Sequence, residues 1–300
     1  MIAKERPTIG FIALLLMLVL IPAFSGGTKA AQEAAGEPSH PSGVTNVLLI
    51  GSDTREPGSY GNSDAMVMVT INHEAKKIFL VSFMRDLYAD IPGVGVEKLN
   101  AAHAVGGGEL LMDTIAANYH VQADNYLETE FATMAELIDL LGGITLELDA
   151  GEVDVANAYI EVMCQEQGLD YNENRISGEG TLTLSGIQAV GYARNRTIGN
   201  DYERTARQRK VLIRMIAKLK VLNPVRIMDI AAKILPKLHT DLELADLVSL
   251  ISQFPAASGY EVVTDRIPYD DLFYSDNEIL VPEMDQTISR LLGEIYEGCM

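Results

Sequence analysis

The chain has 300 residues, 48% of them hydrophobic, so it can bury a substantial core, and a disordered protein is excluded. Its formal net charge of −19 argues against a general nucleic-acid binder, because duplex phosphates repel such a surface. Two cysteines, Cys164 and Cys299, are too few for a disulfide framework and too dispersed for a structural zinc site, and they leave a single disulfide bond open.

The chain opens with a segment that engages a membrane. Lys4 and Arg6 precede an uncharged apolar run over residues 9–24. This run is intermediate in length between the core of a signal peptide and a membrane span of about 20 helical residues. The basic flank predicts that residues 1–8 stay in the cytoplasm and that the rest is exported. An uncleaved transmembrane helix is favoured over a cleaved signal peptide, which predicts a single-pass protein of the cell membrane.

The next residues predict a tether followed by one extracytoplasmic domain. Residues 25–44 are rich in Gly, Ala, Ser, Pro and Glu, a composition that cannot bury apolar surface and is typical of a flexible linker. The folded domain is expected over residues 45–296. It divides into a core that carries the motifs, residues 45–220, and a C-terminal helical extension, residues 221–296.

Hydrophobic patterning predicts the elements of this domain. Three apolar runs, at residues 46–50, 65–71 and 78–83, predict strands whose links are too short for crossover helices, so neighbours are expected to be antiparallel. Farther along, the spacing predicts helices at residues 109–119, 131–141, 153–167, 204–222, 225–235 and 242–251 and a closing helix from Pro282, with strands near Tyr126 and at residues 144–148 and 260–267. The fold class is α/β, with a mixed, partly antiparallel central sheet flanked by helices and preceded by the membrane helix.

Carboxylates gather at one end of the predicted hairpin. Asp53 follows Gly51 at the end of the first strand and Asp64 begins the second, so antiparallel pairing brings both to one edge. Magnesium prefers oxygen ligands and keeps several waters, so two carboxylates plus ligand phosphates suffice. On spacing alone, aspartates that close turns are the simpler interpretation. Arg85 and Asp86 end the third strand at the same edge. Arg85 could contact a phosphate there while Asp86 orients neighbouring guanidinium groups, or the two residues could form a structural ion pair.

Basic residues concentrate in one stretch of this acidic chain. Nine of the 23 Lys and Arg fall between Ser185 and Lys220, where only two acids occur. A short helix is predicted to open at Ser185, with Gln188 as its capping-box partner. Arg194 and Arg196 follow it, and in an extended segment both guanidinium groups would face one side.

The next predicted helix continues this basic stretch. Arg204 and Gln208 are four residues apart near its start, with Arg207 beside them, and helix N-termini favour anions. Converging forked donors suit a diphosphate, whose oxygens accept paired hydrogen bonds from Arg. The alternative is a basic helix face that only contacts water.

Seven short motifs occur in a characteristic order between residues 45 and 220. They read Leu-Leu-Ile-Gly-Ser-Asp-Thr-Arg, Asn-Ser-Asp, Arg-Asp, Lys-Leu-Asn-Ala-Ala, Leu-Gly-Gly-Ile, Tyr-Ala-Arg-Asn-Arg and Asp-Tyr-Glu-Arg-Thr-Ala-Arg-Gln. Together they resemble the LytR-CpsA-Psr family. The resemblance implies an anchored, extracytoplasmic transferase that uses magnesium, with manganese as the alternative ion.

The resemblance also implies roles for individual residues. Asp53 and Asp64 correspond to magnesium-binding carboxylates, and Asp86 and Asp201 to supporting ones. The diphosphate contacts correspond to Arg85, Lys98, Arg194, Arg196, Arg204 and Gln208, and the catalytic group is expected to comprise Arg85, Asp86, Arg194 and Arg196.

Two positions depart from the family pattern. Asn62 stands where the family often has Arg before Ser-Asp, and Met84 stands where it often has Pro before Arg-Asp. One diphosphate donor is therefore expected to be missing, and Arg55 and Arg207 are the candidates to replace it.

The function implied is transfer of a glycopolymer, such as a teichoic acid or a capsule polysaccharide, from a polyprenyl-pyrophosphate carrier to peptidoglycan through a phosphodiester link. The expected partners are that carrier-linked polymer, the peptidoglycan acceptor and the membrane, with no nucleic acid. An apolar pocket for the polyprenyl tail is expected along the helices at residues 131–141 and 153–167. Two alternatives stay open: a polyprenyl-diphosphate hydrolase and a non-catalytic, lipid-binding regulator of the wall.

Overall fold

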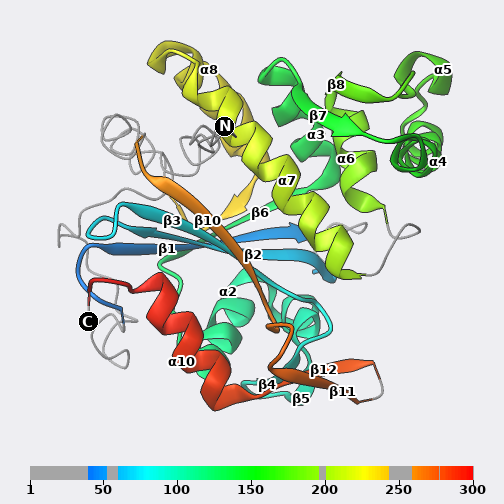
Figure 1. Ribbon diagram of the computed structural model, residues 1–300. Coiled ribbons are helices and arrows are strands. Elements are labelled where there is room, and N and C mark those ends of the chain that lie inside the picture. The colour runs from blue at the N-terminus through cyan, green and yellow to red at the C-terminus, as the bar shows by residue number, and fades with distance from the viewer. Residues whose placement is uncertain (1–39, 53–59, 196–200, 243–258, 277, 300) are drawn as a thin grey trace, which may run out of the picture.

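A computed structural model describes residues 40–52, 60–195, 201–242, 259–276 and 278–299. Its centre is a six-stranded mixed sheet with helices on both faces, which confirms the predicted α/β class (Figure 1). The predicted membrane helix at residues 9–24 lies outside the described residues, as does most of the linker. Within the described ranges, no helix has the length and apolar character needed to cross a membrane.

The central sheet has the order β10-β3-β2-β1-β6-β9. Its strands are β1 (Val44–Ser52), β2 (Ser63–Asn72), β3 (Lys77–Phe83), β6 (Asn125–Glu130), β9 (His239–Thr240) and β10 (Glu261–Ile267). The three strands predicted at the start of the domain are confirmed, and β2 pairs antiparallel with both β1 and β3. The other pairings make the sheet mixed, because β6 runs parallel to β1 and β10 runs parallel to β3.

This topology collects several strand ends at one edge. The C-terminal ends of β1, β3 and β6 and the start of β2 all lie there, since β2 alone among these strands runs the other way. Gly51 of β1 pairs with Ala65 of β2, and a register shift follows before Ser52 pairs with Ser63. The residues just beyond these ends can therefore meet although they are distant in the sequence.

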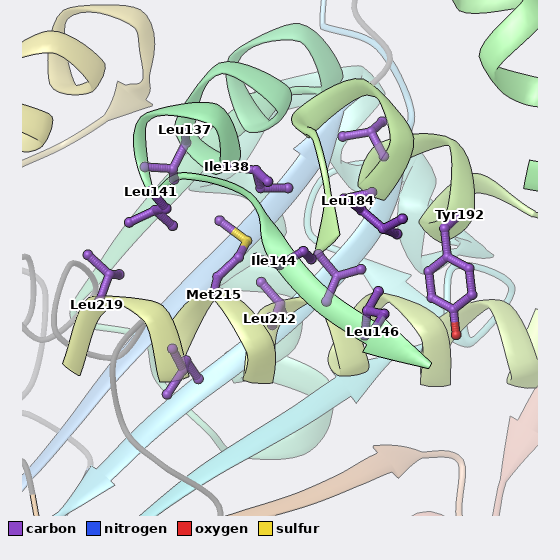
Figure 2. Packing of buried hydrophobic residues seen from close by; sticks show 14 of the residues in the cluster. Leu137, Ile138, Leu141, Ile144, Leu146, Leu184, Tyr192, Leu212, Met215 and Leu219 are labelled. Atoms are coloured by element: carbon purple, nitrogen blue, oxygen red, sulfur yellow. The ribbon is translucent and has the colours of Figure 1, made fainter. Parts of the chain in front are cut away.

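One face of the sheet carries a large hydrophobic core. Side chains such as Val47 and Val67 point into it, and helices cover it (Figure 1). The helices are α3 (Phe131–Leu140), α4 (Ala150–Gln167), α6 (Gly186–Arg194), α7 (Asp201–Lys220) and α8 (Pro224–Ile234). Figure 2 shows part of this core, where Leu137 and Leu141, Ile144 of β7 (Ile144–Leu148) and Met215 and Leu219 of α7 pack together.

The opposite face carries a second core under two helices. Leu48 and Met68, which alternate with the residues of the first core along β1 and β2, pack here. The covering helices are α2 (Leu99–Tyr119) and α10 (Met284–Ile295). Because the central strands are buried on both faces, they read in the sequence as nearly continuous apolar runs.

Small elements surround the two cores. Three two-stranded sheets pair β4 (Tyr88–Ile91) with β5 (Gly95–Lys98), β7 with β8 (Gly180–Leu184), and β11 (Phe273–Asp276) with β12 (Ile279–Pro282). A short helix α5 (Tyr171–Asn174) and a 3-10 turn η1 (Leu235–Lys237) complete the described elements. Cys164 packs in the first core and Cys299 against the second, and both are free thiols.

The structure extends two sequence predictions. Helix α2 starts at Leu99, ten residues before the predicted start, and continues through non-helical backbone at Gly106 and Gly107, which interrupted the apolar periodicity. The C-terminal part is more than a helical extension, because residues 221–296 supply β9 and β10, the two edge strands of the central sheet. The helix predicted at residues 242–251 lies almost entirely outside the described residues.

Gly186→Ala is expected to destabilise the domain. An added Cβ would lie 1.9 Å from the carbonyl oxygen of Ala135, so α6 and α3 would have to move apart at a cost of about 3 kcal/mol. Gly293→Ala is the matched control, because this exposed glycine of α10 has open space around it and alanine there should stabilise by about 0.5 kcal/mol. Urea unfolding of both variants measures the free energy of unfolding, which should fall for Gly186→Ala and rise for Gly293→Ala. Equal stabilities would contradict the close packing of α6 on α3.

Candidate functional site

The candidate site begins at the sheet edge where the strand ends gather. Asp64 is the second residue of β2, and its neighbour Ala65 pairs with Gly51. The side chain of Asp64 is 18% exposed, which leaves its carboxylate accessible at the edge. Asp53 and Arg55 lie outside the described residues, so the predicted pairing of Asp53 with Asp64 stays a prediction.

Asp64 lies between two guanidinium groups from different elements. Nη1 of Arg85, just after β3, is 3.3 Å from Oδ1 of Asp64, and Nη1 of Arg204, in the first turn of α7, is 3.6 Å from the same oxygen. Arg204 also donates a hydrogen bond from Nη2 to the backbone oxygen of Asp64, at 3.3 Å. Arg204 is 2% exposed, so a buried cation fixes both the backbone and the carboxylate of Asp64. The prediction that Arg85 reaches the edge of the hairpin is confirmed.

A second carboxylate extends the network. Asp86 lies 3.4 Å from Nε of Arg85 and 2.9 Å from Nζ of Lys98, the residue before α2. Lys98 also approaches Glu278 at 3.8 Å. The hairpin of β11 and β12 flanks this part of the site, since the Leu280 N–H donates to the Asp86 carbonyl at 2.8 Å. Arg204, Arg85 and Lys98 thus alternate with Asp64, Asp86 and Glu278.

Helices α6 and α7 place the remaining predicted residues. The backbone N–H of Ser185 donates to Oε1 of Gln188 at 2.9 Å, which confirms the predicted capping pair. The prediction that Arg194 lies in an extended segment is wrong, because Arg194 is the last residue of α6. The guanidinium carbon of Arg194 lies 4.5 Å from the centre of the Phe131 ring. Arg196 is outside the described residues.

The Arg207 side chain is buried and contacts other residues of the protein. It is 6% exposed, and its Nη1 donates to the carbonyl oxygen of Asn195 at 3.0 Å. It also lies 3.4 Å from Glu203 one turn earlier. Arg207 therefore ties α7 to the end of α6, which fixes the segment that carries Arg194. Asp201 begins α7, but the described part of the chain does not include its side chain.

An apolar pocket of about 1000 Å³, open mouth included, adjoins the charged network. Its lining comes from the sheet, α3, α6 and α7, and includes Gly51, Ala65, Phe131, Met134, Val190, Ala193, Gln208, Val211 and Leu212. Ala65 is next to Asp64, and Gln208 lies one helical turn after Arg204, so the ionic network lies at the rim of the pocket. The prediction that α3 lines the pocket is confirmed. The prediction that α4 also lines it is wrong, because α4 packs on α6.

The pocket and the network form one amphipathic site. The walls are almost entirely aliphatic and aromatic, and the adjoining rim carries guanidinium and carboxylate groups from β2, the end of β3 and α7. Such a site fits a ligand with a long apolar part and an anionic end. Sequence reasoning missed Glu278 and the hairpin beside Asp86, because no local pattern connects them to the motifs 190 residues earlier.

Comparison with known families gives one extended match. The sequence profile of the LytR_cpsA_psr family matches residues 24–291. The chain is 34% identical over 220 residues to the polyisoprenyl-teichoic acid–peptidoglycan teichoic acid transferase TagU of Enterococcus faecalis, covering 71% of this chain and 67% of that protein. It is 28% identical over 257 residues to the corresponding transferase TagT of Bacillus subtilis, covering 83% of this chain and 77% of that protein.

Solved structures give the same fold. The LytR-CPS2A-psr family protein YwtF (TagT) with bound octaprenyl pyrophosphate lipid superposes with a TM-score of 0.61, covering 91% of this chain and 97% of that one at 24% identity. This likeness confirms the arrangement of the sheet and helices.

Arg85→Met is expected to weaken binding of inorganic pyrophosphate at the rim. Hydrogen bonds to charged groups contribute about 1.5–3 kcal/mol, so affinity should fall about tenfold or more. Arg214→Met is the matched control, because Arg214 is exposed on α7 and its replacement changes the net charge equally. Isothermal titration calorimetry in the presence of magnesium measures both, and equal affinities would exclude Arg85 from the anion site.

Proposed function

This chain belongs to the LytR_cpsA_psr family, and on that premise we propose that it transfers a glycopolymer from a polyprenyl-diphosphate carrier to peptidoglycan, outside the cytoplasm. The single observation that carries the proposal is an apolar pocket with a rim of Arg85, Arg204 and Asp64. The names of the transferases that the chain resembles support the same reaction.

Each part of the carrier has a matching surface. The polyprenyl tail enters the pocket between α3, α6 and α7, where Phe131, Met134 and Leu212 contact it. The diphosphate then lies at the rim, with Arg85 and Lys98 as partly buried donors and Gln208 at the boundary between the two surfaces. Arg204, which is buried, acts by holding Asp64. The local cations let a chain of net charge −19 accept an anion.

The donor set suits magnesium that is shared with a substrate. Asp64 offers hard oxygens and is partly exposed, and its contacts with Arg85 and Arg204, at 3.3 and 3.6 Å, are longer than tight ion pairs. Magnesium keeps several waters, so Asp64, Asp53 and phosphate oxygens would suffice to hold it without an all-protein cage. When bound, magnesium would neutralise charge on the phosphoryl oxygens.

The reaction proceeds at the phosphorus on the sugar side of the diphosphate. A hydroxyl oxygen of peptidoglycan forms the new P–O bond, the bond to the bridging oxygen breaks, and polyprenyl phosphate leaves. Arg85 stabilises the charge that spreads over the phosphoryl oxygens. The hydroxyl proton passes to a carboxylate, for which Asp86 and Asp53 are the candidates. We further propose that residues 9–24 anchor the chain and that residues 25–44 tether the domain near its lipid substrate.

Asp64→Asn is expected to lower polymer transfer about 100-fold, because it removes a metal ligand and the carboxylate shared by Arg85 and Arg204. Asp154→Asn, an exposed change on α4, should leave transfer unchanged. The measurement is mass spectrometry of products formed from a polyprenyl-diphosphate sugar and a labelled peptidoglycan acceptor. Free sugar phosphate without labelled product would identify a hydrolase, and unaltered attachment with Asp64→Asn would overturn the enzymatic assignment.

Ala193→Phe is expected to block the tail but not the head group. The ring would fill the pocket between α6 and α3, and each CH2 group kept out of apolar contact costs about 0.8 kcal/mol. Affinity for a fluorescent polyprenyl diphosphate should fall at least about tenfold, while affinity for inorganic pyrophosphate stays the same. Ala158→Phe, at an exposed site on α4, is the control. Equal losses for both ligands would place the tail elsewhere.

A further inference from the structure

A buried ion pair lies beside the site but outside the charged network at its rim. Nε2 of His103, in α2, is 3.2 Å from Oε2 of Glu128, in β6. The two side chains are 0% and 6% exposed. Burying such groups is costly unless further polar contacts compensate. Neither residue belongs to the motifs that resemble the family, so the pair needs a separate explanation.

The polar contacts of this pair lead to both ends of one segment. Nδ1 of His103 is 2.6 Å from the carbonyl oxygen of Gly61. A carbonyl only accepts, so Nδ1 carries the proton and donates. Glu128 is hydrogen-bonded by the side chain of Ser52, the last residue of β1. Ser52 and Gly61 flank the segment that begins with Asp53, and Asp64 follows Gly61 by three residues.

A packing contact supports the same end of the segment. Gly107 of α2 has φ +65°, and a Cβ there would lie 2.6 Å from the ring of Tyr60. The Tyr60 ring also meets the His103 ring edge-on, with centroids 6.1 Å apart. The kink at Gly106 and Gly107 therefore lets α2 approach Tyr60 and Gly61 closely.

The charge state of the pair is consistent with this contact. Burial alone would lower the pKa of His103, but the Glu128 carboxylate and the Gly61 carbonyl outweigh burial and raise it. Burial would raise the pKa of Glu128, but His103 and Ser52 outweigh it, and His239 adds to the lowering. The raised pKa of His103 favours the protonated imidazole, which donates from Nδ1 to Gly61 and places Nε2 3.2 Å from the Glu128 carboxylate.

We propose that His103 and Glu128 are positioning residues that hold Ser52 and Gly61 in place, and thereby fix where Asp64 presents its carboxylate. The proposal rests on the proposed function in one respect, since it takes Asp64 as a metal ligand. Gly61 lies outside the paired residues of β1 and β2, whose register ends at Ser52 and Ser63, and the imidazole contacts it from α2.

The test isolates the hydrogen bond to Gly61 from the buried charge. Glu128→Gln removes the charge but keeps partners for Ser52 and for a neutral His103, and it serves as the reference. In that background, His103→Asn keeps a donor near the position of Nδ1, whereas His103→Leu, of similar size, has none. His103→Ala is a second variant without a donor, for use if the Leu variant fails to fold. All are made in the full chain.

Two measurements are compared across these variants. Hydrogen exchange followed by mass spectrometry should show faster exchange at residues 60–64 in the Leu variant than in the Asn variant, with the rest of the domain unchanged. Mn²⁺, read by electron paramagnetic resonance, should bind about tenfold more weakly to the Leu variant, because groups that orient metal ligands contribute about that much affinity. The Asn variant should match the reference in both.

Identical exchange and Mn²⁺ affinity in the Leu and Asn variants would overturn the proposal. Faster exchange spread evenly over the whole domain would also overturn it, because the pair would then be only part of the core. If the unaltered chain bound no Mn²⁺, the assignment of Asp64 as a metal ligand would fail instead. The local exchange difference would still decide whether His103 holds Gly61.

Discussion

The Asp64 carboxylate, shared by two guanidinium groups, is the contact on which the rest of the site depends. Arg85 reaches it from the end of β3 and Arg204 from the start of α7, so strand and helix meet at one acidic side chain. Arg204 also binds the Asp64 backbone, which limits how far the start of β2 can shift. The helix that supplies this buried arginine also supplies Gln208, Val211 and Leu212 to the pocket. A shift of α7 would therefore change the geometry of both the rim and the pocket.

The placement of charge explains how an acidic protein handles an anion. Net charge is −19, yet Arg85, Arg204 and Lys98 gather at the site, where they contact Asp64, Asp86 and Glu278. Low solvent exposure strengthens these contacts relative to their strength in water. Overall repulsion of anions combined with a small cationic rim favours a ligand that is also held by apolar contact. A lipid-linked diphosphate satisfies both conditions, whereas a free polyanion satisfies only one.

Two faces of the sheet contribute differently to the site. The pocket lies on the face under α3, α6 and α7, while α2 and α10 cover the second core on the opposite face. From that opposite face, α2 supplies His103, which contacts Gly61 at the same edge of the sheet. Rigid packing on one face can thus hold a segment whose functional side chains serve the other. The close approach depends on the backbone that glycine allows at Gly107.

The sequence by itself determined the features that depend on local periodicity and short links. The three antiparallel strands, the meeting of Arg85 with the hairpin edge and the capping pair of Ser185 and Gln188 all follow from neighbours along the chain. Only the tertiary structure decided that Arg194 ends a helix, that α6 rather than α4 lines the pocket, and that His103 meets Glu128. Those contacts join residues far apart in sequence, or depend on how helices pack, and no local pattern specifies which surfaces meet. Helix spacing predicts an apolar stripe, but the partner of that stripe is selected by the packing of the whole domain.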